Sequence, residues 1–322
     1  MSEALAKTRR LADMRRLGGP AEAEARNAAA AVESSLEALR RPRVSPPEKF
    51  EGRTGYDAAF LDDFEVPMPR PVGRASRDVL AVEGSPDNQL DYQHFSVVMS
   101  RSRKLPMFAA CNIDGKASKS IEREDDVWFL DGRIPLDAQI GEDLYAANDI
   151  DRGHLVRRED PNWGTQEEAE IANEDTFHFP NCTPQMAAFN QKTWLGLENY
   201  VLKEARASKD RITVFGGPVF GAGDIEYRGV KLPLAYWKVI AFTNEDGEPS
   251  ATAYMIDQEK ELKSLEATFG RYKTYQRSVR AIAELTSLDF GDLASYDGFS
   301  NEERATGTRI EAVLQSLADV RV

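Results

Sequence analysis

The spacing of apolar residues divides the chain into three regions. In residues 1–41, apolar side chains recur every three or four positions among many alanines and glutamates, with one break at Gly18-Gly19-Pro20. This spacing predicts two amphipathic helices whose thin apolar stripes are marginal without a partner surface. We therefore expect a helical arm. It is either packed on its own domain or partly disordered, or it serves as a docking or oligomerisation module.

Proline dominates the second region, residues 42–89. Six of the 16 prolines fall between positions 42 and 71, and four aromatic residues are interspersed with them. Proline fixes φ and disfavours helix in the residue before it, so this segment should run extended. The aromatic residues indicate that it is held on a surface. We expect a proline-rich linker packed on the core.

Apolar runs bounded by turn residues predict strands from residue 90 onward. These runs cover residues 94–99, 105–115, 127–130, 133–136, 211–220, 234–243 and 251–257. Strands joined by short turns pair antiparallel, and a helical pattern at 184–207 separates the two groups. We therefore expect an α+β domain over residues 90–322, with a central antiparallel sheet flanked by helices.

Two further apolar stripes lie near the C-terminus. In residues 272–288 and 310–320, apolar side chains again recur every three or four positions. This periodicity predicts C-terminal helices that cover one face of the sheet.

The charge of the chain limits how it could bind nucleic acid. Its 41 lysines and arginines are outnumbered by 54 aspartates and glutamates, for a net charge of −13. Proteins that coat polyanions gain affinity by releasing counterions from many phosphates, and this balance disfavours that mode. The net negative charge remains compatible with an enzyme that binds a few phosphates and uses a divalent cation.

The cysteines and the N-terminus bear on the compartment. Cys111 and Cys182 are too few for a disulfide framework, which favours a reducing environment. The first 16 residues are charged and lack the apolar stretch of a secretory signal, and no run approaches the roughly 18 apolar residues of a membrane span. We expect a cytoplasmic protein that does not bind membranes. An arginine-containing organellar transit peptide at residues 9–16 is the alternative.

Candidate chemistry gathers between residues 149 and 198. His154, one of only three histidines, follows Asp151-Arg152-Gly153. An imidazole with an ordinary pKa of about 6.5 can take a proton from water near neutrality. The Arg152 guanidinium offers paired donors to a phosphate. These residues favour hydrolysis of a phosphodiester.

A candidate metal site follows in the helical pattern. Asn190 and Glu198 are eight residues apart, which is about two helical turns, so both lie on one helix face. Trp194 lies midway as a packing anchor. Mg²⁺ prefers oxygen ligands and keeps several waters, so the Asn190 carbonyl can bind the ion while Glu198 orders its waters. We expect Mg²⁺, with Mn²⁺ as an alternative ion.

This ordered set of residues resembles the DNA/RNA non-specific endonuclease family, the endonuclease G-like ββα-metal nucleases. The resemblance rests on the DRGH motif at 151–154, the Asn-Cys-Thr-Pro-Gln run at 181–185, and the steps of nine and eight residues from Asn181 to Asn190 and on to Glu198. It extends from about residue 94 to residue 290. Residues 1–90 therefore have no counterpart in the minimal family domain, and the expected fold is a ββα-metal nuclease with an N-terminal helical extension.

The resemblance implies a role for each candidate residue. His154 matches the general base of the family, Asn190 its Mg²⁺ ligand and Glu198 the residue that hydrogen-bonds metal-bound water. Arg152 matches the arginine of the motif, and Asn181 matches the asparagine that supports the site.

The family also has an arginine upstream of the motif that contacts phosphate. Arg123 and Arg133 both lie in the corresponding region, and the sequence does not choose between them. Arg152 has a structural alternative as well, an ion pair with Asp149 or Asp151.

Two classes of function follow. The first is a metal-dependent endonuclease that cuts DNA, with RNA as a further substrate. The second is a catalytically silent nucleic-acid-binding or scaffold protein on the same fold. A non-specific nuclease in the cytoplasm endangers its own genome, so we also expect a regulated effector. Residues 1–41 would mediate a homodimer or bind a regulatory partner.

Overall fold

The computed structural model describes residues 42–123, 126–186, 205, 207, 210–258 and 273–314. The chain divides into two compact units, residues 1–43 and 44–322, and the fold below is that of the second unit. The predicted helical arm, residues 1–41, lies outside the described residues. Most of the helix predicted at 184–207 also lies outside them, including Asn190, Trp194 and Glu198.

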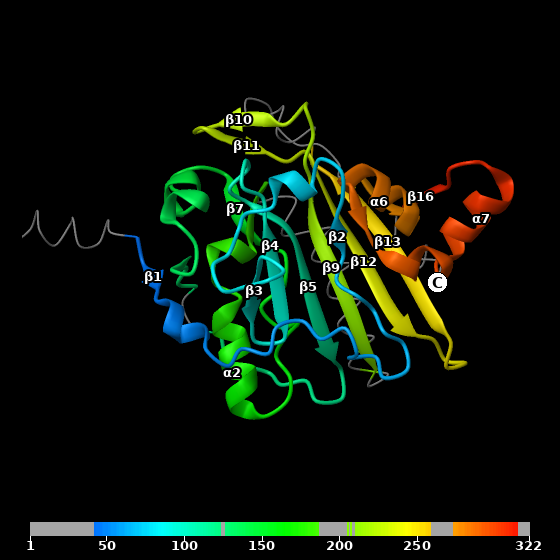
Figure 1. Ribbon diagram of the computed structural model, residues 1–322, viewed down its shortest axis with the longest axis horizontal. Helices are drawn as coiled ribbons and strands as arrows, with labels where there is room; N and C mark the ends of the chain where they lie inside the picture. Colours follow the sequence, from blue (N-terminus) through cyan, green and yellow to red (C-terminus); the bar gives the residue numbers. More distant parts are fainter. Residues whose placement is uncertain are drawn as a thin grey trace, which may run out of the picture. The chain divides into compact units, whose positions relative to one another are not determined.

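An eight-stranded antiparallel sheet forms the centre of this unit (Figure 1). From one edge to the other, its strands are β16 (Glu311–Leu314), β14 (Lys273–Arg277), β13 (Pro249–Asp257), β12 (Ala235–Thr243), β9 (Arg211–Val219), β5 (Pro106–Asp114), β4 (Phe95–Met99) and β3 (Gln89–Tyr92). The strands expected at 94–99, 105–115, 211–220, 234–243 and 251–257 are confirmed. The predicted α+β class, with its central antiparallel sheet, is confirmed as well.

Smaller elements surround the sheet. The helices bounded within the described residues are α2 (Gln166–Asp175), α6 (Val279–Thr286) and α7 (Gly298–Thr306), with 3-10 turns at Pro47–Phe50, Ser76–Asp78, Leu136–Ala138, Glu142–Leu144, Phe179–Asn181 and Gly291–Ser295. The two-stranded pairs are β1 (Val44–Ser45) with β6 (Leu130–Asp131), β2 (Arg70–Pro71) with β15 (Leu288–Asp289), β7 (Ile150–His154) with β8 (Cys182–Met186), and β10 (Ile225–Tyr227) with β11 (Val230–Leu232).

Both faces of the sheet are buried. Along β5, Phe108 and Ala110 join one apolar cluster, whereas Ala109 and Cys111 join another on the opposite face, because successive side chains of a strand point to opposite sides. The first cluster includes α6, which packs against β13. The second includes Leu155, directly after β7. The sheet is therefore the platform on which the β7–β8 pair rests.

The C-terminal prediction was wrong in part. Residues 273–277 form strand β14, not the start of a helix, because Tyr275 pairs with Met255 of β13 in the sheet. The helix begins only after Ser278, whose hydroxyl caps it by accepting the amide N–H of Ala281 at 2.9 Å. The second stripe contributes edge strand β16 at 311–314. The expected cover on one sheet face is thus reduced to α6 and its neighbour α7.

The strands expected at 127–130 and 133–136 do not pair with each other, and residues 133–136 form no strand. Leu130–Asp131 (β6) instead pairs in parallel with Val44–Ser45 (β1). Arg133 turns back and donates from Nη2 to the Asp131 carboxylate at 2.7 Å, so the chain does not continue as a strand. Residues 184–186, the predicted start of the helix at 184–207, instead belong to β8.

Two further structural findings concern the sequence predictions. Cys111 and Cys182 are free and buried. Within the residues that the structure describes, no helix is long and apolar enough to cross a bilayer. The boundaries predicted for the three regions stay a prediction.

An internal ion pair ties the proline-rich region to α2. The Arg53 Nε donates to the Asp175 carboxylate at 2.7 Å, and the same carboxylate accepts the amide N–H of Gln93 at 3.0 Å. The Asp175 side chain is fully buried, and that of Arg53 is 13% exposed. Removing one partner of such a pair leaves an uncompensated charge inside the protein.

We expect Asp175→Asn to lower the free energy of unfolding by about 3–5 kcal/mol, the range for a broken buried pair. Asp289→Asn is the matched control, because its ion pair with Arg70 is largely exposed and should cost less than about 1 kcal/mol. Urea denaturation followed by circular dichroism measures both. Equal losses for the two variants would contradict this account.

Candidate active site

The β7–β8 pair carries the motif histidine. The two strands are antiparallel, with His154 opposite Cys182 and Gly153 opposite Thr183. Strand β8 is fixed to the sheet because the Tyr236 hydroxyl of β12 donates to the carbonyl of Pro184 at 2.6 Å. The side chain of Gln258, which follows β13, accepts the amide N–H of Met186 at 3.1 Å.

Gly153 of the motif is required by its neighbour across the pair. A Cβ built on Gly153 would lie 2.1 Å from the Cδ of Gln185, far inside contact distance. The Gln185 side chain is itself buried and donates to the Thr183 hydroxyl at 3.1 Å, so it cannot move away freely. The Thr183 hydroxyl in turn donates to the Gly153 carbonyl at 3.2 Å. The glycine of the motif and the glutamine of the 181–185 run thus form one packing unit.

The His154 imidazole lies between two aromatic rings. Its centroid is 4.6 Å from the ring of Trp128 and 5.1 Å from that of Phe177. The residue is half-buried, but its Nε2 is buried and makes no hydrogen bond. An imidazole nitrogen held this way is an unused proton acceptor when the ring is neutral with its proton on Nδ1.

Burial lowers the pKa of His154 from its ordinary value to about 3. The carboxylate of Asp126 opposes this shift, whereas the positive charges of Arg123, Arg157 and Arg158 add to it. The ring is therefore neutral throughout the physiological pH range, and its Nε2 can accept a proton.

Two side chains hold the backbone that follows His154. The Asn181 amide accepts the N–H of Val156 at 2.9 Å and donates to the Val156 carbonyl at 2.8 Å, as a strand neighbour would. Its second donor reaches the carbonyl of Thr176 at 3.0 Å. On the sheet side, the buried Lys238 of β12 donates from Nζ to the carbonyl of Leu155 at 3.2 Å.

Arg152 lies two residues before His154 and hence on the same face of β7. Its guanidinium pairs with the carboxylate of Glu142, with Nε 3.0 Å from Oε2 and Nη2 bonded to Oε1. It also lies over the ring of Tyr145, 5.6 Å from the centroid. The structure thus gives Arg152 an ion-pair partner, Glu142, that was not among those considered from the sequence.

The two upstream arginines differ in environment. Arg133 is enclosed: it donates to Asp131 and to the carbonyl of Asp91, and it lies 3.8 Å above the ring of Phe50. Arg123 is exposed and, among the described residues, forms a surface ion pair with Asp126 at 2.6 Å. Arg123 is also the one whose charge acts on His154. It is therefore the better placed of the two to meet a phosphate near His154.

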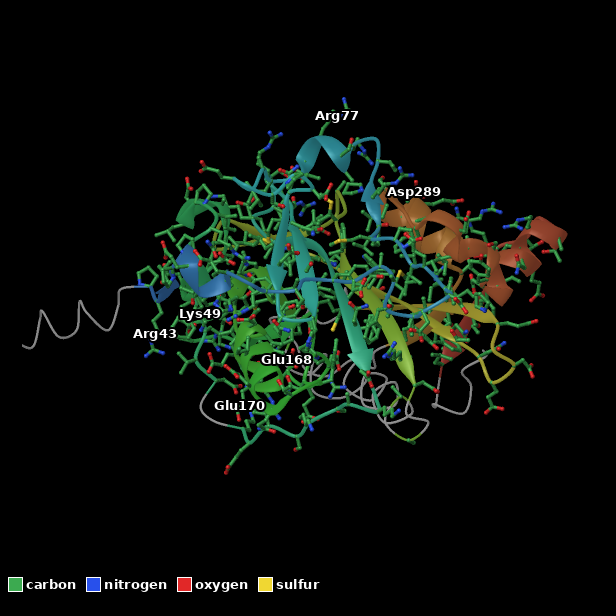
Figure 2. All side chains as sticks on the ribbon, turned by 60° about the horizontal axis from the view of Figure 1, so that its bottom comes forward. Arg43, Lys49, Arg77, Glu168, Glu170 and Asp289 are labelled. Atoms are coloured by element: carbon green, nitrogen blue, oxygen red, sulfur yellow. The ribbon has the colours of Figure 1, made fainter. Side chains whose placement is uncertain are left out.

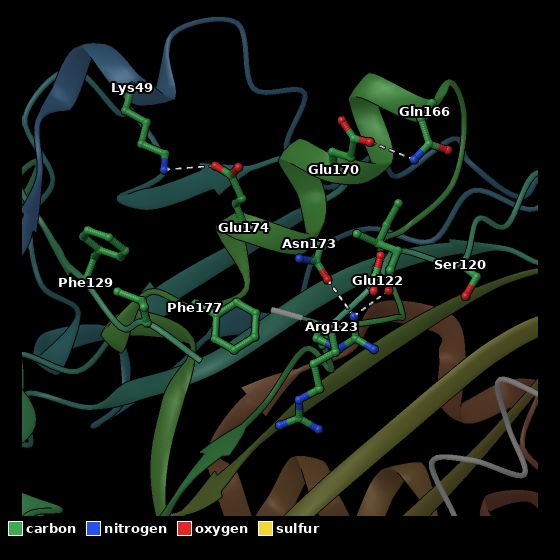
Figure 3. Close-up of a pocket in the computed structure, with 13 residues that line it drawn as sticks. Lys49, Ser120, Glu122, Arg123, Phe129, Gln166, Glu170, Asn173, Glu174 and Phe177 are labelled. Atoms are coloured by element: carbon green, nitrogen blue, oxygen red, sulfur yellow. Dashed lines mark hydrogen bonds and ion pairs between the residues drawn. The ribbon is translucent and has the colours of Figure 1, made fainter. Parts of the chain in front are cut away.

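A cleft of about 820 Å³ lies beside this site (Figure 3). Its basic side chains are Lys49, Arg123 and Arg158, and Phe177 forms part of its wall. Phe177 also contacts His154, so the cleft adjoins the imidazole.

The described residues supply the histidine and its support but not a complete metal site. Among them there is no group of three or more histidine, cysteine or acidic side chains that could hold an ion. The Oε1 of Gln185 is another buried atom without a hydrogen bond, but it lies over Gly153, on the face of β7 opposite to His154. The unbonded imidazole nitrogen of His154 fits the base of a metal-dependent hydrolase, whereas the described residues supply no cluster of ligands for the ion. Asn190 and Glu198 lie outside the described residues and stay predictions for that role.

Sequence reasoning missed three contributors to the site: Trp128, Phe177 and Lys238. Lys238 had a visible signal, because it is the only charged residue within the apolar strand at 235–243. Trp128 and Phe177 carried none, since any core aromatic would have the same pattern. Their closeness to His154 arises from long-range packing.

The fold, together with the DRGH motif at 151–154 and the run at 181–185, defines the class as the ββα-metal nucleases. A solved structure of the EndoG/EndoGI complex, reported with the mechanism of EndoG inhibition, superposes with a TM-score of 0.51 and 18% sequence identity. The likeness covers 65% of this chain and 87% of the other. At this identity, it establishes the shared fold.

A family model for the DNA/RNA non-specific endonucleases matches residues 76–297, and the chain belongs to that family. It is 39% identical over 306 residues to the uncharacterized protein y4fB of Sinorhizobium fredii, across 87% of this chain and 46% of that protein. It is 27% identical over 124 residues to mitochondrial endonuclease G of Homo sapiens and of Bos taurus, across 35% of this chain and 40% of each relative. The chain thus spans less than half the length of these relatives.

The fit between Gly153 and Gln185 gives a first prediction for the site. Gly153→Ala should lower the free energy of unfolding by about 1–3 kcal/mol, because the new methyl group overpacks a buried contact. Gly298→Ala is the control, since a Cβ there meets nothing within 4 Å. Thermal unfolding of both variants measures the difference, and a Gly153→Ala variant as stable as the control would refute the packing argument.

The buried histidines give a second prediction, on stability against pH. Burial lowers the pKa of His94, His154 and His178 in the folded protein, so below pH 6.5 the unfolded chain binds more protons than the folded one. Stability should therefore be greatest above pH 6.5 and fall as the pH drops toward 5. His154 alone contributes up to about 2 kcal/mol of this loss at pH 5, less a discount for its partial exposure.

The melting temperature measured between pH 7.5 and pH 5 tests this account. A His154→Gln variant cannot titrate at this position, so its melting temperature should fall less over the same interval. Identical slopes for parent and variant would show that the imidazole titrates as it does in water.

Proposed function

We propose that this protein is a metal-dependent, sugar-non-specific endonuclease that hydrolyses phosphodiester bonds in DNA, with RNA as a further substrate. The observation that carries the proposal is the neutral imidazole of His154, whose buried Nε2 has no hydrogen-bond partner. It lies on the motif strand inside the family-matched stretch.

In the proposed reaction, His154 takes a proton from the attacking water at Nε2. A base with a pKa of about 3 is weak in the empty protein. A phosphate anion bound beside the ring favours the charged imidazolium and raises that pKa, so the base becomes stronger when substrate is present. Trp128 and Phe177 limit the orientations of the ring, and Asn181 and Lys238 hold the backbone behind it.

The metal and the charged residues complete the proposal. Asn190 would hold Mg²⁺, with Mn²⁺ as an alternative ion, and Glu198 would order the bound water. The ion, when bound, supplies positive charge for the phosphate and leaving oxygens. Arg123 and Arg152 donate to phosphate, and Arg152 must first exchange its bonds to Glu142, which is 55% exposed. Exposed ion pairs are weak, so this exchange costs little.

The setting of the activity is a further part of the proposal. Free cysteines support the cytoplasmic location. The EndoG structure solved with EndoGI concerns inhibition of EndoG, and by analogy we propose that a partner or a homodimer restrains this chain. The role of residues 1–41 in that contact stays a prediction.

We expect His154→Ala to cut supercoiled plasmid in Mg²⁺ on the order of 10²–10⁴ times more slowly than the parent, the usual contribution of a general base. Asn190→Ala should lose activity that excess Mg²⁺ partly restores, and EDTA should abolish cutting by the parent. Gly298→Ala serves as a folded control. A parent protein that binds the plasmid without cutting it would instead favour the catalytically silent alternative.

A further inference from the structure

A segment ahead of the family-matched stretch forms part of the cleft beside His154. The family match begins at residue 76, but β1 at residues 44–45 pairs with β6 inside the matched stretch. The carbonyl of Ser45 accepts the amide N–H of Gly132 at 2.9 Å. A Cβ at Gly132 would lie 2.6 Å from that oxygen, so the contact requires glycine there.

Buried contacts fix this segment in place. The Ser45 hydroxyl and the His178 Nε2 are 2.9 Å apart, and the ring of Phe50 packs edge-on against those of His178 and Tyr92 at 5.0 and 5.4 Å. Pro47 starts the 3-10 turn between them. Lys49 therefore projects from a rigid turn, held by side chains at both ends.

Lys49 faces the cleft. Its Nζ is 3.4 Å from the Glu174 carboxylate of α2 and 5.6 Å from the ring centroid of Phe129, and both residues line the cleft (Figure 3). Figure 2 shows Lys49 on the side of the molecule that carries Glu170 of α2, away from Asp289. The cleft continues from Lys49 to Phe177, which touches the ring of His154.

We propose that Lys49 binds a backbone phosphate of the nucleic acid, so that the substrate site extends beyond the family domain. The inference rests on the proposed nuclease function. Lys49 joins Arg123 and Arg158 in a cleft whose lining also holds the carboxylates of Glu122, Glu170 and Glu174. A phosphate gains a charge-assisted hydrogen bond from the ammonium and displaces the Glu174 carboxylate.

This displacement is cheap because the existing pair is exposed. The Lys49 and Glu174 side chains are 29% and 65% exposed, and such pairs contribute little net stability. The Glu174 carboxylate competes with a phosphate for the Lys49 ammonium, and its negative charge also repels the phosphate. Neutralising the two residues should therefore have opposite effects. Loss of the Lys49 charge weakens binding of nucleic acid, and loss of the Glu174 charge strengthens it.

The test compares Lys49→Gln, Glu174→Gln and Lys104→Gln in the full-length protein. Lys104 is the matched control, an exposed lysine in the turn between β4 and β5 that does not line the cleft. A fluorescent 20-base-pair duplex in EDTA measures binding between 50 and 200 mM NaCl. Plasmid cleavage in Mg²⁺ gives KM and kcat.

We expect Lys49→Gln to reduce the slope of log affinity against log salt by about 0.9, the value for one phosphate contact on duplex DNA. Its KM should rise about 3- to 10-fold with kcat nearly unchanged, because Lys49 grips substrate without touching the reacting atoms. Glu174→Gln should lower KM, and Lys104→Gln should match the parent.

A Lys49→Gln variant with the KM and salt slope of the parent overturns the inference. So does a loss of equal size in Lys104→Gln, which would reflect net charge alone. If the parent cuts DNA and Lys49→Gln is unaffected, only this inference fails. A parent that neither binds nor cuts removes the proposed function together with it. Unchanged melting temperatures for the variants exclude misfolding as the cause.

Discussion

The register between β7 and β8 is the constraint on which the site depends. A slip of one residue would turn His154 to the other face of its strand, away from Trp128 and Phe177. The close fit of Gly153 on Gln185 allows one register, and the Asn181 amide extends the pairing past the end of the strand. These contacts are buried and connect the strand pair to the sheet, so the backbone of His154 is held as firmly as the core.

Burial gives His154 two properties that oppose one another. A desolvated ring stays neutral and keeps Nε2 available, but it also disfavours the imidazolium that a base must become. The nearby arginines increase the second effect in the empty protein. In the proposed reaction, a bound phosphate neutralises those same arginines and removes part of the penalty. Base strength is then coupled to the presence of substrate, which limits proton transfer to the bound state.

Much of the fold could be predicted from the sequence, because the central strands carry dense apolar runs bounded by turns. The β7–β8 pair was not predicted, because residues 150–154 and 182–186 lack a dense apolar run and residues 184–186 were assigned to a helix. Strand β14 was not predictable, since the spacing of Tyr275, Val279 and Ile282 suits a helix equally well. Pairing with β13 decided the outcome, and that is a tertiary contact. The predicted metal residues rest on spacing and resemblance alone.

The two upstream arginines show why the rest of the site needed a structure. Arg123 and Arg133 are ten residues apart and chemically identical, so nothing local distinguishes them. Phe50 stacks on the Arg133 guanidinium, and Asp131 binds it, which commits Arg133 to the fold. The same short turn that places Phe50 on Arg133 directs Lys49 into the cleft. Residues ahead of the family-matched stretch thus occupy the Arg133 guanidinium and add the Lys49 ammonium to the cleft. In a chain with a net charge of −13, the positions of single cations matter more for phosphate binding than their total number.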